Sequence, residues 1–207
     1  MAAPLSTATR RNVPERTPVD ARTAILQAAI RILHDQGAGA LTVRSVATAA
    51  GCSTTGVYTW FGGKNGLVEA IFVDGFQRFG QTLAAVPAHG NQLDHLSSLA
   101  HAYRQWALSN PTHYMVMFGR AVPDFEAGEE ALVTARSTFT GLVTAMTAAV
   151  GAGVIAGDPV QLAHHLWAGI HGYVSLELSD MDMADSTALR DRAFTAGLHM
   201  LLRGCLP

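Results

Sequence analysis

The sequence predicts an all-α protein. Apolar side chains recur at steps of three and four residues along most of the chain, the spacing that gathers them on one face of a helix. No segment alternates apolar and polar residues with the β-branched bias of a strand, and no internal repeat is found. Of the 207 residues, 49% are hydrophobic and only 14% are charged, so the chain can bury a substantial core and does not have a disordered composition.

The first half of the chain is divided by residues that start and end helices. Residues 1–16 have no helical periodicity, and we interpret them as a flexible basic arm. Thr17 can then cap a helix, Pro18 suits its first position, and Gly37 can close it. Glycines divide the sequence that follows. The predicted helices of this half are residues 18–36, 43–50, 54–60 and 64–84.

The second half also consists of helical segments. Pro111 and Pro159 can each occupy the first position of a helix, Pro123 precedes a long helix, and Ser186 can cap the last one. The predicted helices of this half are residues 93–108, 111–118, 124–150, 159–178 and 187–202.

Charge is distributed unevenly along the chain, although the formal net charge is only -2. Residues 1–64 carry seven basic and three acidic side chains, whereas acidic side chains outnumber basic ones by six in the remainder. A basic N-terminal part joined to an acidic, apolar C-terminal part indicates that the two parts bind different partners. The basic part is the candidate for binding nucleic acid.

Several other classes of protein are disfavoured. Cys52 and Cys205 cannot form a disulfide framework and lack the spacing of metal ligands. The N-terminal segment has no apolar stretch typical of a signal peptide. The longest uncharged segment, residues 137–157, is diluted by threonine and glycine, which argues against a membrane span. We therefore expect a cytoplasmic protein without membrane contact.

Residues 42–60 have the size and pattern of a helix-turn-helix, whose second helix enters the major groove of DNA. Gly51 supplies the backbone conformation that the turn requires, and Cys52 is a small apolar residue able to fill the space between the helices. Small residues open the second helix and leave its N-terminus free to approach base edges and phosphates: Ser53, Thr54, Thr55 and Gly56.

This segment resembles the N-terminal signature of the TetR/AcrR-type transcriptional regulators over about residues 20–70. The turn, the aromatic residues and the lysine fall in the same register: Ala50-Gly51-Cys52-Ser53, Val57-Tyr58, Phe61, Lys64 and Leu67. Gly63 and Asn65 depart from the family, which usually has Ser or Asn before this lysine and Glu after it. A second segment is similar to the Trp…His-Gly signature of one group of C-terminal domains in the family: Trp167-Ala168-Gly169-Ile170-His171-Gly172.

The resemblance implies a helix-turn-helix DNA-binding domain at residues 17–66 and a helical effector-binding and dimerisation domain at residues 67–207. It also implies that Tyr58 and Lys64 contact phosphates, although Lys64 could instead be an ordinary solvated charge. The threonines of the second helix are either base readers or plain helix surface. The candidate DNA contacts are Thr42, Arg44, Ser53, Thr54, Thr55, Gly56, Tyr58, Thr59, Trp60 and Lys64, and the arm residues Arg10, Arg11 and Arg16 either reach the minor groove or make no contact.

Aromatic and methionine side chains in the second domain suggest a pocket for a small apolar effector. Such stripes more often belong to a plain core, so both interpretations remain open. A structural role for the histidines is favoured over a metal site, because no histidine of the helix at residues 159–178 has a second histidine or an acid four positions on. The candidate effector contacts are Trp106, His113, Tyr114, Met117, Phe118, Trp167 and His171.

The helix at residues 159–178 has two apolar stripes and therefore needs two partners. One partner can be the core of the same chain, and the other a second copy that completes a two-fold four-helix bundle. The candidate dimer contacts are Leu162, Leu166, Ile170, Tyr173, Phe194, Leu198 and Leu201.

Together these features predict a homodimeric DNA-binding regulator, most simply a repressor that a small, largely apolar effector releases from a palindromic operator. The opposing interpretations are a helical cytoplasmic enzyme and a regulator without effector response. No catalytic motif is found, namely G-x-S-x-G, H-E-x-x-H, Walker A or a dinucleotide fingerprint. We accordingly expect no catalytic residues, no metal and no cofactor.

Overall fold

The computed structural model of the chain describes residues 18–88, 90–179, 181 and 184–206. The predicted arm at residues 1–16, with Arg10, Arg11 and Arg16, and the predicted cap Thr17 lie outside the described residues. The described residues form nine helices and no strand, which confirms the predicted all-α fold. The helices are α1 (Pro18–Gln36), α2 (Val43–Ala50), α3 (Thr54–Phe61), α4 (Lys64–Ala84), α5 (Gln92–Ser109), α6 (Pro111–Phe118), α7 (Glu129–Gly151), α8 (Pro159–Leu178) and α9 (Thr187–Arg203).

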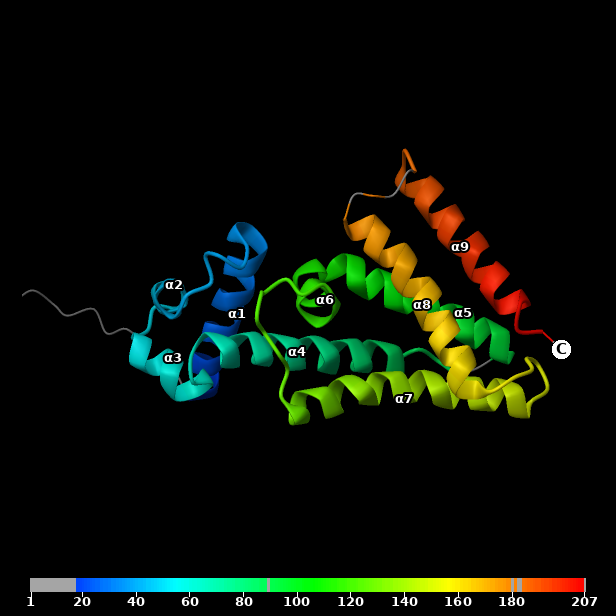
Figure 1. The fold of residues 1–207 in the computed structure, drawn as a ribbon, viewed down its shortest axis with the longest axis horizontal. Helices are drawn as coiled ribbons and strands as arrows, with labels where there is room; N and C mark the ends of the chain where they lie inside the picture. Colours follow the sequence, from blue (N-terminus) through cyan, green and yellow to red (C-terminus); the bar gives the residue numbers. More distant parts are fainter. Residues whose placement is uncertain (1–17, 89, 180, 182–183, 207) are drawn as a thin grey trace, which may run out of the picture.

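The molecule is elongated, with a small head at one end and a larger body at the other (Figure 1). The head contains α1, α2 and α3, and α4 begins there and runs on into the body. In the body α4 packs along α7 and against α6, while α8 packs on α7, α5 and α9. Since α4 continues across the predicted boundary between residues 66 and 67, head and body share one unbroken helix.

Local hydrogen bonds explain why the helices of the head begin and end where the sequence predicts. Thr42 and Ser45 form a reciprocal capping box at the start of α2, with 3.0 Å between Thr42 Oγ1 and the backbone nitrogen of Ser45. Gly51, at a φ of 65°, ends α2 in the left-handed conformation that glycine adopts without strain. Ser53 caps α3, which ends one residue later than predicted, at Phe61.

The largest error in the predicted boundaries concerns the long helix predicted from residue 124, which begins at Glu129. Asp124 has a φ of 61°, a left-handed conformation that interrupts a helix at this point. Residues 119–128 instead form a connection that is tied to α4, because the backbone N–H of Gly128 donates a hydrogen bond of 3.0 Å to Glu69 Oε2.

Candidate functional site

The outer face of α3 carries most of the residues that the sequence predicts to meet DNA. The side-chain oxygen of Ser53 accepts a hydrogen bond of 3.1 Å from the backbone N–H of Gly56 and so fixes the first turn. Thr54, Thr55 and Thr59 are exposed, and the hydroxyl of Thr59 donates to the carbonyl oxygen of Thr55 at 2.9 Å. The exposed surface of α3 therefore offers threonine methyl groups beside a helix N-terminus.

The inner face of α3 holds this helix in a fixed orientation. Val57 and Phe61 are buried, and the Arg22 guanidinium of α1 lies 5.1 Å from the centre of the Phe61 ring. At the start of α4, a Cβ at Gly66 would collide with the carbonyl oxygen of Phe61. The end of α3 and the start of α4 are thus in direct backbone contact, and α3 cannot tilt without moving α4.

Tyr58 and Trp60 leave large parts of their side chains in solvent, 57% and 40% respectively. The Tyr58 ring covers Gly63, where an added Cβ would lie 3.4 Å from Tyr58 Cε1. Gly63 also has a φ of 126°, which side chains rarely adopt. The departure at residue 63 from the family pattern therefore has a structural reason in this chain.

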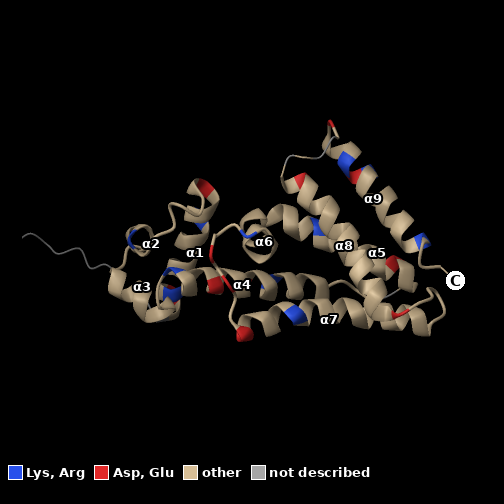
Figure 2. Cartoon of the chain, in the orientation of Figure 1, with Lys and Arg blue, Asp and Glu red and all other residues tan. Residues whose placement is uncertain are grey.

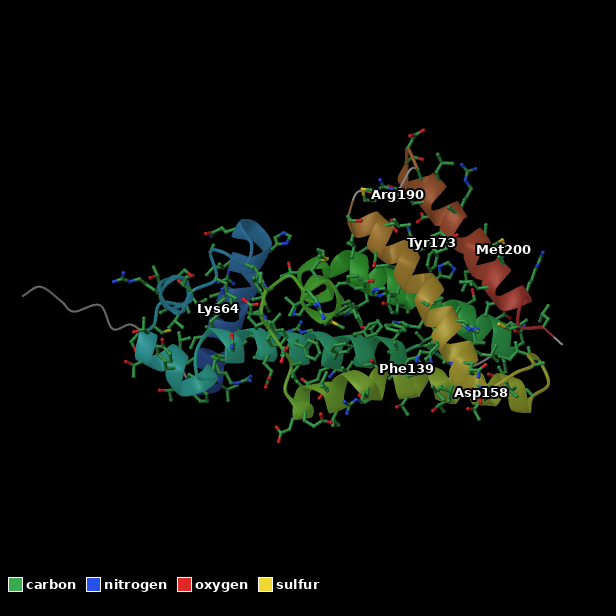
Figure 3. The ribbon with its side chains drawn as sticks, in the orientation of Figure 1. Lys64, Phe139, Asp158, Tyr173, Arg190 and Met200 are labelled. Atoms are coloured by element: carbon green, nitrogen blue, oxygen red, sulfur yellow. The ribbon has the colours of Figure 1, made fainter. Side chains whose placement is uncertain are left out.

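Lys64 is half-buried at the first position of α4 in the head (Figure 3). Its Nζ donates a hydrogen bond of 3.2 Å to the carbonyl oxygen of Ala38, in the connection between α1 and α2. An ammonium group has three donors, so further donors remain for an anion. Arg44 at the start of α2 is exposed, while the hydroxyl of Thr42 is engaged in the capping box. Lys and Arg side chains occur in α1, in α2 and at the start of α4 in the head (Figure 2).

The body contains a cavity of about 1030 Å³ between α4, α5, α7 and α8. Two of the predicted effector residues, Phe118 and Trp167, line it. The cavity is also lined by three side chains that were not predicted from the sequence, Tyr103 of α5, Phe139 of α7 and His164 of α8. Phe139 packs against His164 with 4.5 Å between ring centres, and Figure 3 shows Phe139 on α7.

Small residues explain why this space is not filled. Glycine and alanine occupy the cavity wall on three helices, and an added Cβ at Gly141 would meet nothing within 4 Å. This is the signal that could have located the cavity in the sequence. The small residues are Gly80 and Ala84 of α4, Ala100 of α5, and Ala135, Gly141, Ala145 and Ala148 of α7.

The other predicted effector residues are packed beside the cavity rather than along it. Trp106 lies against Phe79, with 5.1 Å between ring centres, and Met117 fits against Gly75 of α4. His113 Nε2 lies 3.0 Å from Asp74 Oδ2 and joins α6 to α4. These buried contacts support the core interpretation for all three side chains.

The pKa of Asp74 reflects opposing effects. Burial alone would raise the pKa of this carboxyl, but the hydrogen bonds from His113 and Arg78 outweigh burial and hold it below 3.8. The distance between Arg78 Nε and Asp74 Oδ2 is 2.7 Å. Asp74 is therefore ionised at neutral pH and bound on two sides.

Tyr114 and His171, also predicted as effector contacts, form a polar cluster with Tyr103 and Ser175. The hydroxyl oxygens of Tyr114 and Tyr103 lie 2.9 Å and 3.1 Å from His171 Nδ1, and that of Tyr114 lies 3.3 Å from Ser175 Oγ. Burial lowers the pKa of His171 and raises the pKa of Tyr103 and of Tyr114. The cluster is thus uncharged at neutral pH, and Tyr103 is its one member on the cavity wall.

The predicted dimer contacts require a correction, because most of them are already buried within one chain. Leu166 and Ile170 line the cavity, and Leu162, Phe194 and Leu198 are buried in the core. A side chain that its own chain covers has no surface left for a partner. The stripe of α8 assigned to a second copy is the stripe that faces the protein's own interior.

A different set of apolar residues is exposed on α8 and α9. Tyr173 is exposed and contacts Gly197, and Leu201 is half-buried against Gly169 (Figure 3). These small residues let α8 and α9 pack closely. Exposed small or apolar residues on the two helices include Ala168, Gly172, Tyr173 and Leu176 of α8, and Leu189, Ala193, Ala196 and Met200 of α9.

In the described part of the chain, no helix is long and apolar enough to cross a membrane. Within the same residues, no three side chains of His, Cys, Asp or Glu are grouped so that they could hold a metal ion.

Comparisons with known proteins cover both parts of the chain. The family described as "Bacterial regulatory proteins, tetR family" matches residues 25–71, and "Tetracyclin repressor-like, C-terminal domain" matches residues 96–201. The HTH-type transcriptional regulator Rv1816 of Mycobacterium tuberculosis is 24% identical over 211 residues, which span 86% of this chain and 89% of that protein.

Solved structures agree in fold. A protein of unknown function from Rhodococcus sp. RHA1 has a TM-score of 0.81 at 24% identity, covering 96% of this chain and 100% of that one. A TetR family transcription regulator from Marinobacter aquaeolei VT8 has a TM-score of 0.68 at 19% identity, covering 90% of this chain and 96% of that one.

Proposed function

Because the chain belongs to the tetR family of bacterial regulatory proteins and is a DNA-binding transcriptional regulator, we propose that it is a repressor, released from a palindromic operator by a small, largely apolar effector. Family membership favours a regulator over a helical enzyme. Since its target is chromosomal DNA, we place its action in the cytoplasm.

The observation that carries the proposal is the course of α4. This helix begins at Lys64, against the end of α3, and its second half lines the cavity through Phe76, Phe79 and Leu83. A molecule that changes the position of α4 in the cavity therefore acts on the element that orients α3. The cavity also favours an effector-responsive regulator over one without effector response.

The size and lining of the cavity support an apolar effector. Its volume of about 1030 Å³ is at the upper end of the range of small-molecule sites, about 300–1,000 Å³. In this proposal the effector contacts are Phe118 and Trp167 together with Tyr103, Phe139 and His164. A ligand shifts the equilibrium between two conformers only by its difference in affinity for them. The effector must therefore prefer a conformer in which the DNA-binding heads of the two subunits are spaced wrongly for the operator.

We propose that residues 17–66 form the DNA-binding domain and residues 67–207 the effector-binding and dimerisation domain. The proposed DNA contacts are those predicted from the sequence. The exposed threonines of α3 would read bases, while Tyr58 and Lys64 would bind phosphates on either side of the groove. Two copies of α3 about 34–36 Å apart would occupy successive major grooves.

The second copy is required for this spacing, and we assign the contact to the exposed face of α8 and α9. Leu176 and Met200 are 51% and 75% exposed, which is costly for apolar side chains in a lone subunit. Pairing these faces around a two-fold axis would give a four-helix bundle.

The test begins with the operator. Duplexes bound by the full chain would be selected from a random pool, and binding would be followed by fluorescence anisotropy at several salt concentrations. We expect a palindromic consensus, a strong salt dependence, and release by at least one uncharged apolar compound. Phe118→Ala should change the releasing concentration while the operator Kd without ligand stays within about threefold. Binding without salt dependence would contradict the proposed contacts with DNA. Failure of every compound to release the protein would contradict the proposed effector response.

A further inference from the structure

The hydroxyl groups of α7 on the cavity wall have hydrogen-bond partners within the protein. The α7 hydroxyls that line the cavity all donate their hydrogen to a backbone carbonyl of the same helix, as Thr138 does to Ala135 at 2.7 Å and Thr144 to Thr140 at 3.0 Å. The others in this set are Thr134, Ser137 and Thr140. Such a hydroxyl presents a ligand with an acceptor oxygen and, in threonine, a methyl group, but with no donor.

The two histidines of the wall are constrained in a similar way. His164 Nδ1 lies 3.0 Å from the carbonyl oxygen of Val160, and His95 Nδ1 lies 3.1 Å from that of Pro87. A carbonyl only accepts, so Nδ1 carries the proton in each neutral ring and Nε2 is left as an acceptor. Neither ring then offers a donor to a ligand.

Charge is nearly absent from the described wall. None of its residues is Asp or Glu, and its one arginine, Arg136, is exposed and pairs with Glu129 at 2.7 Å. A buried charge without a partner is costly. A ligand with an ammonium group would find no carboxylate in this wall, and a ligand with a carboxylate would face oxygen acceptors along α7.

Tyr103 differs from these groups because its hydroxyl can donate a hydrogen bond to a ligand. It is 6% exposed, and it shares His171 Nδ1 with Tyr114. Whichever tautomer His171 adopts, Nδ1 takes part in one hydrogen bond at a time, so the two hydroxyls cannot both donate to it. Tyr114 is the nearer, at 2.9 Å against 3.1 Å, and can satisfy His171 alone.

The Tyr103 proton therefore remains to be placed. It can turn into the cavity without removing the partner of His171, provided that the incoming group is an acceptor.

The geometry points to an uncharged, largely apolar effector with a carbonyl oxygen that accepts a hydrogen bond from Tyr103. This inference rests on the proposed effector response of the same cavity and adds the chemical class of the effector. Burial keeps the pKa of Tyr103 above its usual value, so the phenol holds its proton throughout the physiological range.

The test uses four compounds with the same two-ring body and the full-length protein. Benzophenone has a carbonyl, diphenylmethane has a methylene in its place, diphenylacetate is an anion, and benzhydrylammonium is a cation. Each is titrated against protein loaded with the neutral dye Nile red, and displacement is followed by fluorescence. We expect benzophenone to displace the dye at about tenfold lower concentration than diphenylmethane, the value of one buried hydrogen bond, and both ions to displace it least.

Two variants separate a ligand contact from a structural role. Tyr103→Phe should reduce the advantage of benzophenone over diphenylmethane to within about twofold. The control, Ser175→Ala, changes the same cluster away from the cavity wall, leaves Tyr114 free to pair with His171, and should keep the advantage. Circular dichroism melting checks that both variants fold.

Several outcomes would overturn the inference. They are equal displacement by benzophenone and diphenylmethane with the unmodified protein, stronger displacement by either ion, equal loss in the two variants, or no displacement of Nile red by any compound. Operator binding, measured separately by anisotropy, would remain intact in each case. Loss of operator binding would instead contradict the proposed function itself.

Discussion

Arg104 on α5 and Glu177 on α8 form a buried bidentate ion pair, with both nitrogen–oxygen distances at 2.8 Å. Each side chain is only 10% exposed. Arg104 Nη1 also donates to Asp191 of α9 at 2.7 Å, and the guanidinium lies 5.1 Å from the centre of the Phe194 ring. One side chain thus connects the cavity-lining helix α5 to both helices of the proposed dimer face.

Replacing this arginine should destabilise the subunit strongly. Arg104→Met leaves the Glu177 carboxylate buried without its partner, and we expect the free energy of unfolding to fall by about 3–5 kcal/mol. Asp191→Asn is the control: the Asp191 side chain is 58% exposed, so its loss should cost about 1 kcal/mol or less. Urea unfolding at one fixed protein concentration measures both, and equal losses would contradict the role given to Glu177.

Lys64 should bind phosphate without regard to sequence. We expect Lys64→Ala to weaken binding to every duplex by a similar factor and to reduce the slope of log K against log salt by about one unit, since one phosphate contact is lost. Lys64→Arg keeps the charge and should keep the slope. Anisotropy titrations over a range of salt concentrations give the slopes, and an unchanged slope in Lys64→Ala would remove Lys64 from the phosphate contacts.

Thr55 should affect the choice of sequence instead. Thr55→Ala removes the methyl and hydroxyl groups from the exposed face of α3, and we expect altered preference among operators at nearly unchanged affinity for unrelated DNA. Thr55→Ser keeps the hydroxyl and tests for a contact between the threonine methyl and a thymine methyl. Repeating the selection from a random pool with each variant measures the preference. An equal loss on all duplexes would show that Thr55 does not read bases.

The dimer face can be tested at a position that is exposed in the single chain. Leu176→Arg places a charge on α8 without disturbing the subunit core, so we expect a folded monomer in sedimentation at micromolar concentration. Val133→Arg on α7, at a position of similar exposure, is the control and should stay dimeric. By contrast, Leu166→Arg should unfold the subunit itself, because Leu166 is buried. A monomeric unmodified protein would refute the dimer.

Stability should decrease as the pH falls below 6.5, in part through His171. Burial lowers the pKa of His171 in the folded chain, so the unfolded chain takes up this proton first. The free energy of unfolding therefore falls as the pH drops from 6.5 toward the lower pKa of the folded state. In His171→Gln this contribution is absent, and the decrease should be shallower. Chemical unfolding between pH 5 and pH 8 measures the difference, and parallel pH profiles would contradict it.

The sequence was most informative where a signal is local. Thr42, Gly51 and Ser53 act on backbone groups within a few residues, so the limits of α2 and the start of α3 could be predicted from residue type. The start of α7 was missed because Asp124 adopts a left-handed conformation and Gly128 is bound to Glu69, a residue 59 positions away. A contact of that separation leaves no local pattern.

By itself, the sequence of this protein determined the all-α fold, the helix-turn-helix and the family, because helix periodicity, caps and turn glycines depend on neighbours along the chain. Only the tertiary structure decided which stripe of α8 is covered and which residues surround the cavity. Leu166 and Leu176 are both leucines on one helix, yet one lines the cavity and the other is exposed. The physical reason is that burial depends on the helices packed around a residue, and periodicity shows only that two faces are apolar.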